Sequence, residues 1–339
     1  MTRPIVTLTL NPAIDRTVWV DELVPGTTHR TADMHATFGG KGINVARVVA
    51  RIGAPVVALG LAGEDQATPI ERYLDSLGVP SRFIRTPGET RTNLKVIEQA
   101  TGRLTEINGS GPEVSTDQVD ELERELLSVV EGRRAAAVVF AGSLPRGVDA
   151  SVYARWTEIL RGAWPNLRVL ADTSDEALER ITRAGPFFLK PNRVEAAALT
   201  GRRIETAEDA QVAAREIIRQ GARGVLVSLG SAGSVAAWGA EVEVLSPNQI
   251  EVPPGQLQTT VGAGDAMVAR IAVELAKLDG AHVGPKAFFA MCRLAAAEAE
   301  AQIGGVVLSR EPLGPTASGY SPITPPDDGR QGVVPMVDG

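Results

Sequence analysis

Residues 260–265, Thr-Val-Gly-Ala-Gly-Asp, place two glycines and a carboxylate directly before an apolar stretch. This order predicts a tight turn that opens a buried helix. The first backbone N–H groups of such a helix have no partner within it, and the helix dipole favours negative charge there. A phosphoryl group could bind at that position, and Asp265 could take a proton from a hydroxyl group that attacks the phosphorus. The alternative is that Asp265 only caps the helix.

A second glycine-rich segment, Phe-Gly-Gly-Lys-Gly-Ile-Asn-Val-Ala, occupies residues 38–46. Three glycines in four positions let the backbone approach a ligand closely, and a helix is predicted to follow at once. The spacing is neither that of a Walker A loop nor that of a dinucleotide-binding fingerprint. Taken alone, the segment is also compatible with an ordinary turn and helix start.

Polar residues follow two of the predicted strands. Asp15 lies just past the strand predicted at residues 5–10. Ligands of open α/β sheets bind near the carboxyl ends of strands, so Asp15 could accept hydrogen bonds from sugar hydroxyls. In the segment 190–195, Glu195 could hold the water shell of a magnesium ion. A surface turn for Asp15 and an exposed helical position for Glu195 are the alternatives.

Basic residues occur in two β-rich segments. Arg30 lies in one of them, and Arg91, with Lys95 nearby, lies in the other. If the two segments form one small sheet, these charges could converge on a substrate phosphate. The alternative is that they are solvated strand residues.

The composition excludes several classes of protein. The 339-residue chain has a net charge of −7, no basic cluster and only 4% aromatic residues, which argues against a nucleic-acid partner. No apolar run approaches the length of a membrane span, and the N-terminus does not resemble a signal peptide. The single cysteine excludes an internal disulfide, and His29, His35 and His282 show no metal-ligand spacing. We expect a cytoplasmic protein without a membrane partner.

Short apolar runs alternate with helical patterns along most of the chain. Runs of strand length occur at 5–10, 56–61, 136–140, 169–171, 187–189 and 225–229. Helical periodicity occurs at 42–52, 68–77, 116–130, 150–160 and 207–219. Strands that are apolar on both faces are typical of parallel sheets covered by helices. The pattern therefore predicts a doubly wound α/β fold with a mostly parallel sheet.

Two segments interrupt this alternation, at about 16–38 and 82–107, and both have the pattern of strands and turns. We expect them to pair into a small sheet that acts as a lid and excludes water. Residues 312–339 contain six prolines and five glycines without apolar periodicity, so we expect a disordered tail. The predicted organisation is one domain over residues 1–311, lid included, followed by this tail.

Together, these segments resemble the PfkB carbohydrate kinase family, the ribokinase-like sugar kinases. The resemblance covers nearly all of residues 4–308. It rests on the 39–44 signature near the N-terminus and the 261–265 signature near the C-terminus, which occur in the family's order. It implies a three-layer α/β/α fold with a β lid, and a phosphorylation of a sugar hydroxyl that depends on ATP and Mg²⁺.

The resemblance also implies a role for each matching residue. Asp265 would be the general base, and the amides of Gly262, Ala263 and Gly264 would form an anion hole. The positions matched on the substrate side are Asp15, Arg30, Gly39, Gly40, Lys41, Asn44, Arg91, Asn93 and Ser143. Those on the nucleotide side are Lys190, Asn192, Ser228, Gly230 and Gly233. Glu195 and Asp172 match metal positions.

Residues 9–15, 91–95, 141–145 and 172–174, together with Lys41, resemble the hexose-phosphate kinases of this family, most of all those that act on fructose 1-phosphate. Fructose 6-phosphate and tagatose 6-phosphate are the alternative acceptors, and a catalytically silent sugar-phosphate sensor on the same fold is a third possibility. Arg270 stands where a small residue is usual, and we expect it to face solvent or a partner subunit. Exposed edges of the lid strands favour a homodimer formed through the lid.

Overall fold

The computed structural model describes residues 3–31, 34–247 and 262–305. The predicted tail at 312–339 and the first two residues of the 260–265 motif lie outside these ranges. Within them, no helix is both long enough and apolar enough to cross a membrane.

A nine-stranded sheet forms the centre of the molecule, in the order β13-β12-β11-β10-β9-β8-β1-β4-β5. Neighbouring strands are parallel from β11 to β5, and β12 and β13 continue the sheet antiparallel. The strands are β1 (Ile5–Thr9), β4 (Val56–Gly63), β5 (Ser81–Thr86), β8 (Ala137–Ala141), β9 (Arg168–Asp172), β10 (Phe188–Leu189), β11 (Gly224–Ser228), β12 (Ser234–Trp238) and β13 (Glu241–Leu245). The predicted mostly parallel α/β sheet is confirmed, and β12 and β13 add two strands to the prediction.

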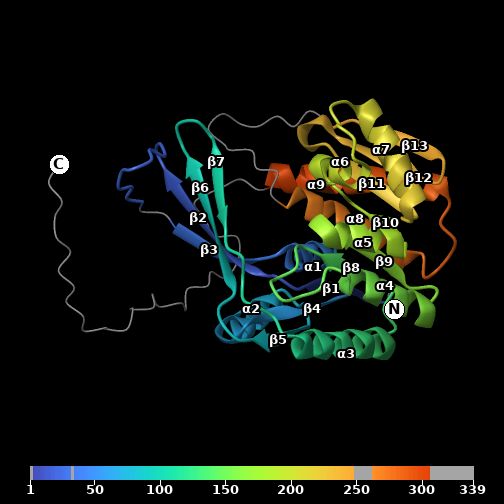
Figure 1. The fold of residues 1–339 in the computed structure, drawn as a ribbon, viewed down its shortest axis with the longest axis horizontal. Helices are drawn as coiled ribbons and strands as arrows, with labels where there is room; N and C mark the ends of the chain where they lie inside the picture. Colours follow the sequence, from blue (N-terminus) through green and yellow to red (C-terminus); the bar gives the residue numbers. More distant parts are fainter. Residues whose placement is uncertain (1–2, 32–33, 248–261, 306–339) are drawn as a thin grey trace.

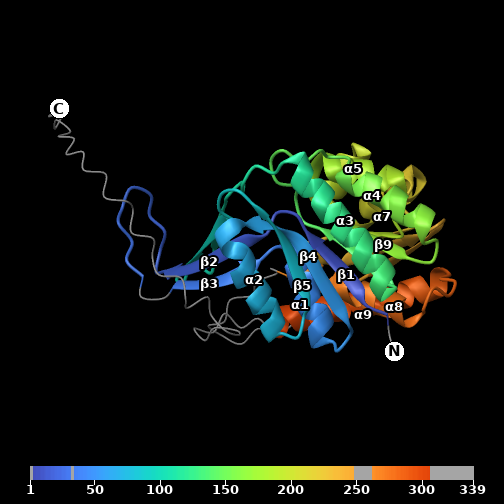
Figure 2. The same ribbon diagram turned by 90° about the horizontal axis from the view of Figure 1, so that it is seen from below.

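Helices cover both faces of this sheet (Figure 2). One face is covered by α1 (Lys41–Arg51), α2 (Glu64–Ser76), α8 (Ala263–Lys277) and α9 (Pro285–Gly305). The other is covered by α3 (Thr116–Arg133), α4 (Val152–Ala163), α5 (Asp175–Ala184), α6 (Arg193–Thr200) and α7 (Ala207–Gln220). Because successive side chains of a strand point to opposite faces, Ile5 of β1 packs into the first core and Val6 into the second. The fold is a three-layer α/β/α sandwich.

The lid is a separate four-stranded sheet in the order β3-β2-β6-β7. Its strands are β2 (Ala13–Val20), β3 (Met34–Gly39), β6 (Arg91–Glu98) and β7 (Leu104–Asn108). The sheet projects from one side of the sandwich (Figures 1 and 2). Only three residues separate β1 from β2, so the chain runs from the main sheet almost directly into the lid.

One part of the predicted lid belongs elsewhere. Residues 82–84, at the start of the second predicted lid segment, are part of β5, which pairs in parallel with β4 at the edge of the main sheet. Phe83 and Ile84 are both buried, although they point to opposite faces. A strand buried on both faces needs a helical layer on each side, which the lid sheet lacks. The second lid segment is therefore formed by β6 and β7 alone.

Candidate active site

Several of the predicted site residues gather where β1, β8, β9 and β10 end, beside the first turns of α1 and α8. Asn44 of α1 donates from Nδ2 to Oδ2 of Asp265 in α8, over 2.8 Å. Lys41, the first residue of α1, donates from Nζ to Oδ1 of Asp172, the last residue of β9, over 2.7 Å. These contacts join segments that are far apart in the sequence at the carboxyl edge of the sheet, the usual ligand site of open α/β folds.

The helix predicted after the 260–265 motif is α8, and its N-cap is Gly262 in the left-handed conformation, with φ of 81°. Only a glycine adopts this conformation without strain. Asp265 stands in the first turn with a side chain that is only 6% exposed. Its carboxylate is directed to Asn44 of α1, and no side-chain bond caps the helix. Among the described residues, no side chain caps the first N–H groups of α8, so these groups can bind an anion.

The surroundings of Asp265 favour its neutral form. Burial raises the pKa of its carboxyl group, and the nearby carboxylate of Asp172 raises it further. Lys41, the hydrogen bond from Asn44 and Lys190 act in the opposite direction, and the resulting pKa is about 6. A carboxylate with this pKa is ionised at pH 7 and is a stronger base than an exposed aspartate.

Asp172 holds two lysines. Its side chain is 1% exposed, and Oδ1 accepts the hydrogen bond from Lys41. Oδ2 lies 3.1 Å from Nζ of Lys190, in an ion pair. Burial would raise the pKa of Asp172, but Lys190 and Lys41 lower it more, so the group stays ionised. Burial lowers the pKa of Lys41, and Asp172, Glu195 and Asp265 together raise it above its usual value. Lys41 is thus held as a cation, and Lys190 forms the second ion pair of Asp172.

Lys190 also contacts the start of α8. A Cβ atom added to Gly264 would lie 3.0 Å from Nζ of Lys190, so glycine at this position lets the ammonium group approach the helix backbone. One ammonium group therefore lies beside the free N–H groups of α8 and beside the buried Asp172. The arrangement concentrates positive charge close to the Asp265 carboxylate.

The glycines of the 38–46 segment have packing roles that their sequence does not reveal. A Cβ atom on Gly42 would meet Oγ1 of Thr9 at 2.3 Å, and one on Gly40 would meet Cγ2 of Thr9 at 2.7 Å. Both glycines allow α1 to pack against the end of β1. Gly39 makes room for Asp15, because a Cβ atom there would lie 2.6 Å from Oδ2 of that residue. Close packing therefore brings Lys41 and Asn44 into the site.

Asp15 lies on the lid strand β2 and accepts two side-chain hydrogen bonds. Nδ2 of Asn93 donates to Oδ1 over 2.8 Å, and Nζ of Lys95 donates to Oδ2 over 3.0 Å. The side chains of Asp15 and Lys95 are each 16% exposed. The structure thus brings Asp15, Asn93 and Lys95 together on the lid.

Arg91 is bound to the backbone at the base of the lid. Its guanidinium group donates to the carbonyl oxygens of Asn11 over 3.0 Å, Pro12 over 3.3 Å and Gly109 over 3.4 Å. Burial lowers its pKa, although Asp15 acts in the opposite direction. Three of its five N–H donors are thus occupied, and Arg91 joins the start of β2 to the segment after β7.

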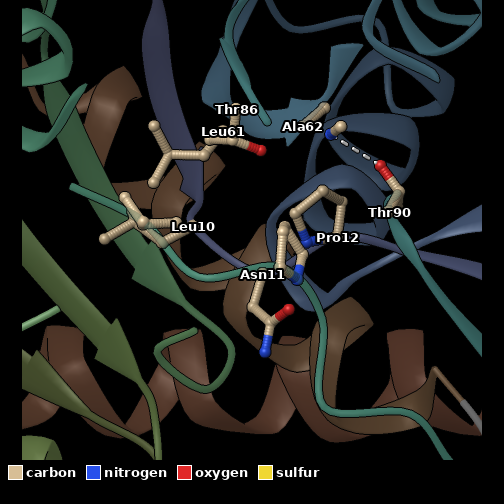
Figure 3. Close-up of a pocket in the computed structure, with 10 residues that line it drawn as sticks. Leu10, Asn11, Pro12, Leu61, Ala62, Thr86 and Thr90 are labelled. Carbon is tan, nitrogen blue, oxygen red and sulfur yellow. Dashed lines mark hydrogen bonds between the residues drawn. The ribbon is translucent and has the colours of Figure 1, made fainter. Parts of the chain in front are cut away.

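A small cavity lies next to this point and is lined by Asn11, Pro12, Leu61 and Thr86, among others (Figure 3). Its volume of about 10 Å³ has room for one water molecule and not for a sugar. Ser143, predicted on the substrate side, accepts a hydrogen bond from Nδ2 of Asn11 over 3.4 Å. Asn11 therefore lines this cavity and also contacts Ser143.

The residues predicted on the nucleotide side follow β10 and β11. Asn192 and Ser228 form an isolated parallel bridge, and Gly230 begins a short 3₁₀ helix, η1 (Gly230–Ala232). Close packing requires a glycine at position 233, because a Cβ atom there would lie 2.3 Å from the carbonyl oxygen of Leu245. The structure brings these positions together at one end of the sheet.

Asn192 and Glu195 form a capping box at the start of α6. Oδ1 of Asn192 accepts from the N–H of Glu195 over 2.9 Å, and Oε2 of Glu195 accepts from the N–H of Asn192 over 2.8 Å. An Asn followed three residues later by a Glu is the local sequence signal of this motif, and it was not among the sequence predictions. Burial raises the pKa of Glu195, against the effect of Lys41. Its Oε1 is not used by the cap.

Arg30 does not contact the other predicted site residues in the described part of the chain. It is exposed in the loop between β2 and β3. Over the described ranges, no hydrogen bond or ion pair joins Arg30 to the other predicted site residues. The same residues include no group of three or more His, Cys, Asp or Glu side chains arranged to hold a metal ion.

The chain is similar to a family of known proteins along most of its length. The model for "pfkB family carbohydrate kinase" matches residues 6–306. The 1-phosphofructokinase of Vibrio cholerae is 35% identical over 269 residues, which cover 79% of this chain and 82% of that protein. The 1-phosphofructokinase of Bacillus subtilis is 34% identical over 273 residues, which cover 80% of this chain and 86% of that protein.

Solved structures agree with these similarities. The tetrameric inhibited form of phosphofructokinase-2 from Escherichia coli superimposes with a TM-score of 0.78 at 30% identity, over 89% of this chain and 94% of that one. A possible 1-phosphofructokinase from Thermotoga maritima superimposes with a TM-score of 0.77 at 26% identity, over 92% of this chain and 94% of that one.

Proposed function

The chain belongs to the pfkB family of carbohydrate kinases, and from this premise we propose that it transfers a phosphoryl group from ATP to fructose 1-phosphate, giving fructose 1,6-bisphosphate. Membership of the family makes it a phosphotransferase that uses an alcohol group as acceptor. The observation that carries the proposal is the buried Asp265, hydrogen-bonded to Asn44 and set beside the N-terminus of α8 and two fixed lysines. The curated relatives supply the acceptor.

In the proposed mechanism, the Asp265 carboxylate takes the proton of the acceptor hydroxyl. The hydroxyl oxygen forms a bond to the γ-phosphorus of ATP while the bond from that phosphorus to the bridging oxygen of ADP breaks. The free N–H groups at Gly262, Ala263 and Gly264 and the ammonium groups of Lys41 and Lys190 would stabilise the charge on the transferring group. Asn44 holds the base in position.

A magnesium ion fits Glu195 and does not fit Asp172. Mg²⁺ is usually held by one or two carboxylates together with substrate phosphates and waters. Glu195 keeps Oε1 outside its capping box, whereas both oxygens of Asp172 face lysine ammonium groups. We therefore assign Asp172, which the sequence suggested as a metal ligand, to holding Lys41 and Lys190. When bound, the ion would neutralise phosphate charge.

The lid also supports the proposed homodimer. The sheet ends at β3 and β7, whose outer edges have no neighbouring strand among the described residues. Met34 on β3 is 55% exposed and Ile107 on β7 is 61% exposed. Both lie on the face of the lid that also bears Val18 and Val96, because they pair in register with Val18 and Leu94. Apolar side chains at open sheet edges favour pairing with a second copy.

A panel of acceptors tests the proposal. Purified protein with ATP and Mg²⁺ is assayed for kcat/KM with fructose 1-phosphate, fructose 6-phosphate, tagatose 6-phosphate, fructose and ribose. We expect kcat/KM for fructose 1-phosphate to exceed that for each other acceptor by about tenfold or more, about 1.4 kcal/mol of discrimination. A higher kcat/KM for fructose 6-phosphate or tagatose 6-phosphate would show that this sugar, and not fructose 1-phosphate, is the acceptor. Ligand-dependent thermal stabilisation with no ADP formed on any sugar would indicate a silent sensor.

A further inference from the structure

The two faces of the lid sheet differ in chemistry. Residues paired in register across a sheet share a face, and alternate residues along a strand lie on opposite faces. Asp15, Asn93 and Asn108 form one row across β2, β6 and β7, and Thr17, Lys95 and Glu106 form the next row of the same face. The opposite face carries the apolar cluster of Val18, Val20 and Val96. Lys95 therefore lies on the polar face, next to Asp15.

Lys95 and Arg91 are held in different ways. An ammonium group has three N–H donors, and the only ion pair that the described residues give Lys95 is the one to Asp15. Glu106, which faces it in register, is exposed and forms no ion pair with it in the described part of the chain. Arg91 donates to three backbone carbonyl oxygens. Each side chain keeps two further N–H donors, but of the two only Lys95 forms an ion pair with Asp15 in the described part of the chain. Lys95 is therefore the lid cation that lies directly beside the carboxylate proposed to bind the sugar.

The ion pair between Lys95 and Asp15 also sets the net charge of the proposed sugar site. Asp15 contacts Gly39, at the start of the segment that carries Lys41 and Asn44. An unpaired carboxylate there would attract sugar hydroxyls but repel a phosphate dianion. The ammonium group of Lys95, 3.0 Å from Oδ2 of Asp15, balances this charge and leaves two N–H groups for phosphate oxygens.

We propose that Lys95 determines the specificity of this kinase for phosphorylated acceptors, by neutralising Asp15 and donating to the acceptor phosphate. The inference rests on the proposed function, because it assumes that Asp15 binds the sugar. Of the three basic residues that the sequence suggested for the substrate phosphate, Arg30, Arg91 and Lys95, it assigns this part to Lys95. It also predicts a selective effect, since a neutral sugar needs only the Asp15 oxygens.

The test compares Lys95→Met with the wild type, using fructose 1-phosphate and unphosphorylated fructose as acceptors. We expect kcat/KM for fructose 1-phosphate to fall about 100-fold, because a charge-assisted bond is lost and an unbalanced carboxylate remains. For fructose, kcat/KM should change by less than about threefold. Lys95→Arg, which keeps the charge, should recover most of the activity with the phosphorylated acceptor.

Lys277→Met is the matched control, since Lys277 pairs with Glu274 over 2.8 Å at the exposed end of α8. It should leave both values unchanged. Equal losses of kcat/KM with both acceptors in Lys95→Met would overturn the proposal, because Lys95 would then only hold Asp15 in place. An unchanged kcat/KM with both acceptors would also overturn it. Lys95→Gln serves if Lys95→Met does not fold, as judged by circular dichroism. If the wild type prefers fructose 6-phosphate, the proposed acceptor fails, and the same ratio measured with that sugar still tests Lys95.

Discussion

The burial of Asp265 links its proposed catalytic role to the stability of the fold. Its carboxyl group is 6% exposed and lies near the ionised Asp172, so its charged form is disfavoured in the folded protein. A base that must be charged at neutral pH therefore destabilises the structure that positions it. Functional sites commonly combine activity with such a local cost in stability.

The substitution Asp265→Asn should separate these two effects. We expect kcat to fall about 1,000-fold, since a general base typically contributes between about 10² and 10⁴. At pH 8 the free energy of unfolding should rise by about 1–3 kcal/mol, because a buried charge is removed. Activity assays measure the change in kcat, and urea unfolding measures the change in the free energy of unfolding. Asp279→Asn is the control, because Asp279 is 75% exposed and should change neither.

The direction of the pH dependence follows from the same pKa. The folded pKa of about 6 lies above 3.8, the ordinary pKa of an aspartate, so the folded state binds more protons between these values. The contribution of Asp265 to stability is complete below pH 3.8 and is lost as pH rises through 6. The kcat/KM of the wild type should instead fall as pH drops below 6, because the base becomes protonated. A rate profile that stays flat down to pH 5 in folded protein would contradict the assignment.

At the scale of elements, an ion network joins three helices around the site. Nη2 of Arg270 in α8 lies 2.7 Å from Oε2 of Glu298 in α9, and Oε1 of Glu298 accepts from Arg51 of α1 over 2.8 Å. Arg270 also pairs with Glu274 over 3.3 Å. The expectation that Arg270 faces solvent or a partner subunit is therefore replaced by an internal role. Glu298 connects the helix that carries Asp265 with the helix that carries Asn44.

Replacing Arg270 by Ala should test this connection. We expect the free energy of unfolding to fall by about 1–2 kcal/mol, since the Arg270 side chain is 24% exposed and Glu298 is only 10% exposed. Urea unfolding measures the change, and a double-mutant cycle with Glu298→Gln isolates the pair. The pair of Arg180 and Glu176 is exposed, so Arg180→Ala should cost less than about 0.5 kcal/mol. Equal losses for the two arginines would show that the network adds no stability.

At the scale of the whole molecule, the lid is a thin sheet with little support of its own. Its apolar cluster contains three buried residues, whereas each face of the main sheet packs against an extensive helical layer. Small sheets of this kind are stabilised by further packing. A second copy of the chain would supply it through the proposed lid contact.

The substitution Ile107→Glu should prevent that association. We expect the wild type to sediment as a dimer and the variant as a monomer at micromolar concentration, since a charge would be buried in an apolar contact. Analytical ultracentrifugation over a concentration series measures this change. Val212→Glu is the control, since Val212 is 42% exposed on α7 and lies outside the lid. A monomeric wild type would exclude the dimer, and an Ile107→Glu dimer would place the contact elsewhere.

The sequence by itself determined the α/β class, most of the strands and helices, and the types of residue needed for phosphoryl transfer. These features depend on local patterns: apolar runs, helical periodicity, and glycines before a carboxylate. The helices that begin after Ser115 and Thr206 both start with capping boxes, which depend on residues only three positions apart in the sequence. The candidate residues of the site could be named, but not their contacts.

Only the tertiary structure decided which of these residues meet. Lys41, Asp172 and Lys190 form one ion-paired group because β9 and β10 are neighbours in the sheet and α1 begins beside their ends. Lys95 reaches Asp15 because β2 and β6 pair in parallel in one register. The placement of residues 82–84 in the main sheet and the separation of Arg30 from the site have the same origin. Strand order and register join residues that are distant in the chain, and local sequence patterns carry little information about such pairings.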